Sequence, residues 1–319
     1  MATQSQNYRA VDLIWGIAIV LVSAICAIIV PLTTYAATLA TFGIAHVAIE
    51  LRYIHSRFNR RLNRKTIPWL IALVLAIATI RCVSIWGFIP SNIAQLLELG
   101  CGLGLVTIAT HYLWIRDWKL GALGTIVGCL LTIGIVCDPI ATLVIFAIFH
   151  NLTPVGFILE RQGFKSPRII WICGVFFGLL PLIIILYQLV PIVNLPSEIN
   201  DTYLRAFIAP SWQQSALAYP LFSAVAFLQC MHYAVVIGLF SRWTPDFDNS
   251  PIQHPTRYFY LLLGGISMLL FISFQHTFIL TRAGYGVVAS IHAWIEIPLL
   301  LIATDRRLEI PTIVPLDKK

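Results

Sequence analysis

Charged side chains are scarce in this chain. Only 11% of its 319 residues are Asp, Glu, Lys or Arg, whereas 59% are hydrophobic, and the mean hydropathy is +0.85. Apolar runs of about 20 residues, the length that a helix needs to cross a bilayer, recur along the sequence. This composition excludes an ordinary soluble domain. It predicts an all-α, polytopic transmembrane helical bundle of about ten spans, with residues 1–319 forming a single integral membrane domain.

Acidic residues are scarcer than basic ones. The chain has 14 Asp and Glu against 21 Lys and Arg, which gives a formal net charge of +7. In a soluble domain this excess would suggest nucleic acid, but here the basic residues collect between apolar segments, where orientation in the bilayer explains them. We expect membrane lipid around the protein and no nucleic-acid partner.

The chain also lacks any closely spaced cysteine pair. Its seven cysteines contain no CxxC spacing and nearly all fall inside apolar runs. We interpret them as small buried apolar side chains and expect neither a disulfide framework nor a zinc site.

The apolar segments predict ten spans. The expected ranges are roughly 12–32, 36–55, 68–89, 93–115, 120–136, 139–158, 169–193, 213–241, 257–280 and 285–304. Basic residues follow every second span, so these loops share one side. The positive-inside rule then places both termini in the cytoplasm, in a bacterial inner membrane. Residues 194–212 are expected to form an interfacial segment.

Ionisable side chains inside the spans are informative, because they are costly at bilayer depth and mark functional sites. Of eight histidines, His55 and His254 are expected in polar loops, His111 near one interface and His276 toward the opposite end of its span. The other four each precede a charged residue at the basic end of a span: His46, His150, His232 and His292. At 1.5 Å rise per residue, these four lie about 10 to 20 Å inside the membrane.

These four histidines are expected to share one layer, because their spans run in the same direction. Imidazole is a common ligand for Fe, Zn and Cu, so the layer is a candidate metal site. Glu50 follows His46 and Glu296 follows His292, each at i+4 on the same helix face. The two glutamates are candidate catalytic carboxylates, either as groups that orient the imidazoles or as ligands. Two alternatives remain open: interhelical hydrogen bonding and a proton relay.

Two motifs resemble the Brp/Blh family of membrane-embedded β-carotene dioxygenases. The stretch FGIAHVAIE is similar to the family's Phe-Gly-x-x-His-Gly-x-x-Asp, with Phe42, Gly43 and His46 matching, Val47 in place of glycine and Glu50 in place of aspartate. The stretch FAIFHNLTPVGFILER is similar to the family's second histidine helix around His150. The family's closely spaced histidine pair is absent.

The resemblance implies a non-haem iron oxygenase. Fe(2+) would use O2 to cleave a carotenoid to a retinal-type aldehyde, held by His46 and His150, which lie in the matching motifs, and by His232 and His292, which are assigned to the later ligands by their depth in the membrane. Val47 would narrow the space beside the metal, so hydroxylation or desaturation of another lipid stays open. The alternatives from other classes are a His/Glu proton-coupled transporter and a haem-carrying membrane subunit.

Two expectations concern residues outside this layer. Arg81 and Glu98 lie on either side of the short loop at Pro90 and are expected to pair. Several aromatic residues are candidates to line a slot for a long apolar substrate: Phe42, Trp86, Phe146, Phe149, Phe227, Tyr233, Phe274 and Trp294.

Overall fold

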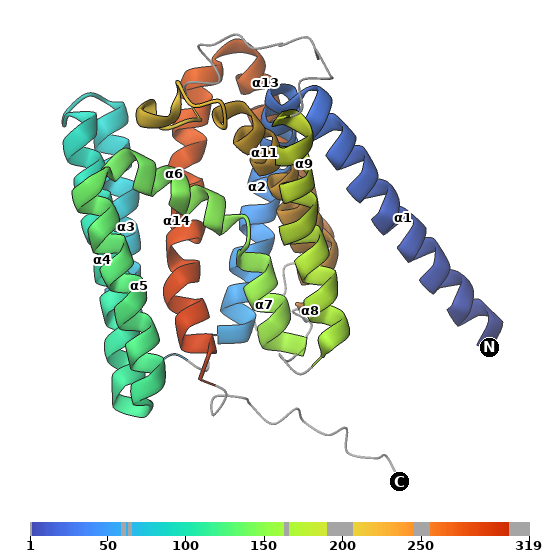
Figure 1. The fold of residues 1–319 in the computed structure, drawn as a ribbon, viewed down its shortest axis with the longest axis horizontal. Helices are drawn as coiled ribbons and strands as arrows, with labels where there is room; N and C mark the ends of the chain where they lie inside the picture. Colours follow the sequence, from blue (N-terminus) through green and yellow to red (C-terminus); the bar gives the residue numbers. More distant parts are fainter. Residues whose placement is uncertain are drawn as a thin grey trace.

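The computed structural model is a helical bundle (Figure 1), and no strand occurs among the residues it describes. It describes residues 2–58, 62, 66–162, 166–189, 207–244 and 256–305. The all-α prediction is therefore confirmed for this part of the chain. Most of the predicted interfacial segment and His254 lie outside the described residues. The last part of that segment forms a short 3-10 turn, Pro210–Trp212.

Within the described residues, nine helical segments are long and apolar enough to cross a membrane. They are α2 (Pro31–Phe58), α3 (Ile67–Ile85), α4 (Ser91–Arg116), α5 (Trp118–Cys137), α6 (Pro139–His150) with α7 (Thr153–Gln162), α8 (Pro167–Gly174) with the π turn Val175–Leu179 and α9 (Leu180–Leu189), α11 (Ala218–Val235) with the π turn Val236–Phe240 and α12 (Ser241–Trp243), α13 (Thr256–His276) and α14 (Phe278–Ala303). Helix α1 (Ala2–Ile29) carries a shorter apolar stretch, Ile14–Ile29, and leans away from the bundle in Figure 1. The spans therefore follow the predicted order.

The start of the last span differs from the prediction. Helix α14 begins at Phe278, after a break at Thr277, and not at residue 285. Gly284 and Gly286 lie inside the helix and continue it. In lipid the backbone N–H and C=O groups must be satisfied internally, so a glycine does not end a helix there as it often does in water.

The sixth span is broken at Pro154. Proline has no N–H and its ring clashes with the carbonyl four residues earlier, which is that of His150. The Oγ1 hydroxyl of Thr153 donates to this carbonyl instead, at 2.7 Å. As a result α6 ends at His150 and α7 starts at Thr153. In Figure 1, α6 runs obliquely across the bundle before α7 turns down. His150 is the last residue of α6, and its imidazole contacts Glu296 and His292 of α14.

The centre of the bundle consists of α2, α11 and α14. In the most apolar stretch of the span Ala218–Trp243, 67% of the residues are buried, and in that of α14 the share is 56%, against 11% for α5 and α13. The outer helices therefore present most of their apolar side chains to lipid. Polar side chains on the three central helices lie far from it.

Ion pairs join the basic ends of the even-numbered spans. Arg57 at the end of α2 contacts Glu160 in α7 at 2.9 Å, and Arg116 at the end of α4 contacts Asp305 beyond α14 at 3.3 Å. The first contact joins the ends of α2 and α7, and the second joins those of α4 and α14. Phe58, Phe157 and Ala303 also pack in one apolar cluster, so the ends of all four helices lie on one side of the bundle. The predicted common direction of the histidine-bearing helices is thus confirmed for three of them, α2, α7 with its preceding α6, and α14.

Candidate metal centre

The four predicted histidines converge at the centre of the bundle. His46 comes from α2, His150 from the end of α6, His232 from α11 and His292 from α14. One ligand atom of each lies within 4.8 Å of those of the other three. His46, His232 and His292 are 0–1% exposed, and the His150 side chain is 13% exposed. The predicted convergence is confirmed, and the group could hold a metal ion.

Three of these imidazoles meet nitrogen to nitrogen. His292 Nε2 lies 3.2 Å from His46 Nε2 and 3.1 Å from His150 Nε2. Two nitrogens bound to one ion at about 2.0 to 2.1 Å lie roughly 2.8 to 3.4 Å apart for ligand angles between 90° and 109°. The observed separations fit ligands of a common ion.

Hydrogen bonds at the other ring nitrogen orient two of these imidazoles. His150 Nδ1 donates to Glu296 Oε2 at 2.8 Å, and His46 Nδ1 donates to the Phe42 carbonyl at 3.3 Å. With a proton on each Nδ1, both Nε2 atoms carry a lone pair. The single Nε2 of His292 can offer its proton to only one of them. In at least one of the two contacts, the Nε2 lone pairs therefore face each other and repel. A cation bound between the nitrogens would remove this repulsion.

The two glutamates contact histidines on neighbouring helices and not the histidine four residues before them. Glu296 on α14 bonds His150, as described, and Glu50 Oε2 on α2 lies 3.3 Å from His232 Nε2, with an alignment too poor for a hydrogen bond. Glu50, His292 and Glu296 also bring one ligand atom each within 4.8 Å of one another. The six side chains form one cluster, which we call the His/Glu cluster.

Several atoms of the His/Glu cluster are buried without a hydrogen-bond partner among the described residues. They are both carboxylate oxygens of Glu50, Oε1 of Glu296, both ring nitrogens of His232 and Nδ1 of His292. Glu50 and Glu296 are 0% exposed. Glu296 keeps one partner, His150, whereas neither oxygen of Glu50 has a hydrogen-bond partner among the described residues, and a buried carboxylate without a compensating partner costs several kcal/mol. These atoms therefore fit a bound cation better than a purely structural polar network.

Aromatic packing fixes the position of His46. Its ring stacks on that of Tyr233, with centroids 4.1 Å apart and an interplanar angle of 30°. The absence of a side chain at Gly43 allows a second close approach, because a Cβ there would lie 2.8 Å from the Tyr285 ring. The Tyr285 hydroxyl donates to the Gly43 carbonyl at 3.4 Å. This explains the glycine three residues before His46.

A cavity of about 240 Å³ adjoins the His/Glu cluster, and we call it the inner cavity. His46, His150 and His292 line it, together with Phe146, Tyr233 and Tyr285. Val47 is 3% exposed and is not one of the residues lining the inner cavity, so it does not narrow this space as expected. A substrate in the inner cavity would reach three of the four imidazoles.

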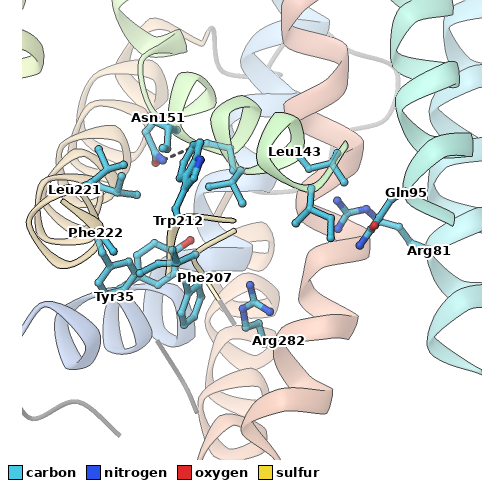
Figure 2. Close-up of a pocket in the computed structure, with 17 residues that line it drawn as sticks. Tyr35, Arg81, Gln95, Leu143, Asn151, Phe207, Trp212, Leu221, Phe222 and Arg282 are labelled. Carbon is cyan, nitrogen blue, oxygen red and sulfur yellow. Dashed lines mark hydrogen bonds between the residues drawn. The ribbon is translucent and has the colours of Figure 1, made fainter. Parts of the chain in front are cut away.

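A second cavity of about 330 Å³, the outer cavity, adjoins the inner one. Figure 2 shows the residues that line the outer cavity. The two share lining residues, among them Tyr35, Asn151 and Phe207. Asn151 donates to the Ala147 carbonyl of its own helix at 2.9 Å. In the view of Figure 2, Tyr35, Leu221 and Phe222 lie on one side of the outer cavity and Arg81 with Gln95 on the other, with Arg282 between them.

The aromatic residues proposed for the slot separate into three groups. Phe146 and Tyr233 line the inner cavity. Phe227, Phe274 and Trp294 are buried in apolar packing. Phe42, Trp86 and Phe149 are 44%, 78% and 62% exposed and face outward, so the predicted slot role is wrong for these three.

The predicted pair of Arg81 and Glu98 is confirmed. The guanidinium donates to both carboxylate oxygens, at 2.7 and 2.8 Å, and to the Gly286 carbonyl at 3.0 Å. Trp294 Nε1 also donates to Glu98, at 2.8 Å. This network ties α3, α4 and α14 together next to His292.

Histidines predicted to lie outside the centre do so. His55, His111 and His276 are exposed and belong to neither candidate metal group.

Sequence reasoning missed Arg282, which lines both cavities. The signal was present, because an arginine inside an apolar run is a functional candidate. It was obscured by placing the start of the last span at residue 285, which left Arg282 in a loop.

No family model, curated protein or solved structure matches the chain.

Proposed function

We propose that this chain is a membrane-embedded, metal-dependent oxygenase that acts on a lipid-soluble substrate. The observation that carries the proposal is the convergence of four buried imidazoles and two buried carboxylates, several of whose polar atoms find no hydrogen-bond partner among the described residues. The similarity of FGIAHVAIE to the Brp/Blh motif supports Fe(2+) as the metal and oxidative cleavage of a carotenoid to a retinal-type aldehyde as the leading reaction.

In this proposal His46, His150, His232 and His292 hold the iron. An Fe(2+) ion bound by histidines supplies the activation of O2 for attack on a carbon–carbon double bond. The chain itself contributes orientation: Glu296 fixes the tautomer of His150, and the Phe42 carbonyl fixes that of His46.

Glu50 and Glu296 also set the charge of the site. Two carboxylates balance the two positive charges of a divalent ion, so a loaded His/Glu cluster with both groups ionised is neutral overall. Neutrality matters here, because the centre of the bundle is shielded from water by apolar helices. The charge balance favours one divalent ion over two.

The two cavities provide the place for a long apolar substrate. Their walls carry aromatic and aliphatic side chains, including Phe146, Phe207 and Leu143, while the histidines occupy one end. Ligand sites in proteins commonly combine apolar walls with a few convergent polar groups. The same walls keep bulk water away from the iron.

We propose that both termini face the cytoplasm of a bacterial inner membrane. The basic residues Arg57 and Arg116 lie at helix ends on one side of the bundle, and such residues are retained on the cytoplasmic side.

The alternative functions predict that the purified protein carries no redox metal or carries haem. A proton-coupled transporter would use the His/Glu cluster without a redox metal. A haem-carrying subunit would need a macrocycle between two imidazoles, whereas the ring centroids of neighbouring cluster histidines are only 4.7 to 5.3 Å apart. The packing of these rings therefore favours a bare ion over haem.

The first test is metal analysis with an absorption spectrum. Wild-type protein should contain about one non-haem iron per chain and no Soret band. His292→Ala should lose the iron, whereas the matched control His276→Ala, which replaces an exposed histidine outside the cluster, should keep it. Equal iron in both variants, or no metal in the wild type, would overturn the oxygenase.

The second test concerns the reaction. Expression in carotenoid-producing cells should remove the orange colour and yield a retinal-type aldehyde detectable by chromatography, and His292→Ala should abolish both effects. Unchanged pigment with iron bound would leave a metal-dependent enzyme that acts on another lipid.

A further inference from the structure

A third cavity, of about 260 Å³, lies between α3 and α4, and we call it the polar vestibule. Five polar side chains line it, which are Arg81, Ser84, Ser91, Gln95 and Glu98. Lipid chains offer such groups no hydrogen bonds, so polar side chains at membrane depth face either a protein partner or a water-filled space. The lining of the polar vestibule therefore suits water better than lipid.

The charged groups of the polar vestibule neutralise each other. The Arg81 guanidinium donates to both carboxylate oxygens of Glu98, at 2.7 and 2.8 Å. This pairing leaves no net charge that would attract an ion. The hydroxyls of Ser84 and Ser91 and the amide of Gln95 can hydrogen-bond neutral molecules, and Figure 2 shows Gln95 beside Arg81. Water and other small neutral molecules that form hydrogen bonds are the ligands that fit.

The polar vestibule lies near the end of the bundle opposite the basic helix ends. Helix α4 begins at Ser91, which is exposed, and ends at Arg116, whose ion pair marks the basic side. Arg81 is four residues from the end of α3, Gln95 four from the start of α4, and Ala283 five from the start of α14. Each is about 6 to 8 Å along its helix. Three helices thus give the same depth, where the apolar layer meets head groups and water.

The polar vestibule adjoins the inner cavity. Arg81, Leu143 and Ala283 line both spaces. From Ala283 the inner cavity follows α14 past Ser290 to His292, which is nine residues further along the helix, about 14 Å deeper. A route therefore leads from the exposed start of α4 to the imidazoles.

We propose that the polar vestibule is an aqueous entrance, through which water and other small neutral molecules reach the inner cavity from the solution that faces the loop between α3 and α4. Metal binding releases protons from histidine and carboxylate ligands, and a buried site needs a path for them to solution. Entry of single water molecules here is distinct from the bulk water that the apolar walls exclude. The inference goes beyond the proposed function and does not depend on which metal is bound.

The test is the reactivity of introduced cysteines toward iodoacetamide, a small neutral reagent, in full-length protein in phosphatidylcholine nanodiscs. Ala283→Cys places a thiol where the polar vestibule meets the inner cavity. The matched control Gly284→Cys places one at the next position of α14, which lines none of the three cavities and where a Cβ has no atom within 4 Å. We expect Ala283→Cys to react about tenfold faster or more, because the thiolate is the reactive form and a thiol in lipid does not ionise. The last natural cysteine is Cys230, so mass spectrometry of the segment after Arg282 reports the introduced thiol alone.

A second measurement identifies the face. A charged methanethiosulfonate that does not cross membranes is added to sealed vesicles of either orientation. Ala283→Cys should react in the vesicles that label Ser91→Cys, at the exposed start of α4. It should stay unmodified in those that label Arg168→Cys, at an exposed position in the first turn of α8, next to the basic end of α7.

Each outcome decides. Equal reactivity of Ala283→Cys and Gly284→Cys overturns the proposal, and so does labelling of Ala283→Cys from the side of Arg168. If Ala283→Cys does not fold, Ser84→Cys replaces it, because it exchanges a hydroxyl for a thiol in the same cavity; protection of this thiol to the level of Gly284→Cys overturns the proposal equally. Since labelling requires no metal, an open entrance without iron and iron without an open entrance identify separately which of the two proposals fails.

Discussion

Replacing Gly102 with alanine should destabilise the bundle beside the His/Glu cluster. Gly102 lies on α4, and a Cβ there would be 2.1 Å from Cζ3 and 2.3 Å from Cη2 of the Trp294 ring. Trp294 is 0% exposed, stacks on Phe146 with centroids 4.0 Å apart and donates to Glu98. The ring cannot retreat without losing that packing and that hydrogen bond.

The size of the effect follows from these contacts. Overpacking of a filled site costs about 1 to 3 kcal/mol, and loss of an interhelical hydrogen bond in a membrane protein costs about 0.6 to 1.7 kcal/mol. The higher helix propensity of alanine stabilises the folded state by about 0.5 to 1 kcal/mol relative to glycine. We expect a net loss of about 2 to 3 kcal/mol for Gly102→Ala.

The matched control lies two residues earlier on the same helix. A Cβ at Gly100 would have no atom within 4 Å, so Gly100→Ala should be neutral or slightly stabilising. Thermal melting in detergent micelles compares the two variants with the wild type, and Gly102→Ala should melt several degrees lower. The same variant should bind less iron, because Trp294 lies between His292 and Glu296 on α14. Equal melting temperatures for the two alanine variants would show that α4 and α14 do not pack as closely at Gly102 and Trp294 as these distances require.

Three further predictions concern other polar contacts. Arg81→Gln leaves the buried Glu98 without its counter-charge and should lower the free energy of unfolding by about 3 kcal/mol, measured by thermal melting. The double variant Arg81→Gln with Glu98→Gln should lose less stability, and an equal loss in both variants would contradict this reasoning. Glu296→Gln keeps the shape of the side chain but removes its charge, and should weaken iron binding about tenfold or more, measured by metal titration. The Ala141 N–H and the Ser211 hydroxyl lower the pKa of Asp138, which lies between two spans. This pKa is lower in the folded than in the unfolded chain, so the stability that Asp138 provides is fully present above about pH 4 and is lost as the pH falls through the lowered pKa. The difference in melting temperature between wild type and Asp138→Asn should shrink in that range.

The depth of the histidine layer could be predicted from sequence, because charged residues mark the membrane face and the helical rise converts residue number into depth. His46, with Arg52 and Arg57 behind it, and His232, with Arg242 behind it, show this clearly. The depth of a residue does not predict whether its side chain points into the bundle or toward lipid. Each histidine had to point inward for the four imidazoles to come together. The i+4 glutamates supplied that information for two of the helices.

The lateral arrangement of the helices could not be predicted in the same way. Glu50 shares a helix face with His46, yet its carboxylate contacts His232 of α11. The partner of Glu50 depends on which helix lies next to α2, and the sequence does not give this. The break after His150 is a second case. Pro154 predicts a kink, but only the packing of α6 against its neighbours shows that the chain changes direction there and presents an imidazole from a helix end.

The location of the His/Glu cluster links folding to metal binding. Five of its six side chains come from α2, α11 and α14, the helices that carry the most buried residues, and the sixth is delivered by the break after α6. A bundle stabilised by apolar contacts with lipid and between helices gains nothing from placing two carboxylates at its centre. The proposed divalent ion would reverse this balance, because it would bring positive charge to Glu50 Oε1 and Oε2 and to Glu296 Oε1, which have no hydrogen-bond partner among the described residues. If the proposed ion binds there, its binding free energy would be part of the free energy of folding, and the ion proposed for the chemistry would also hold the central helices together.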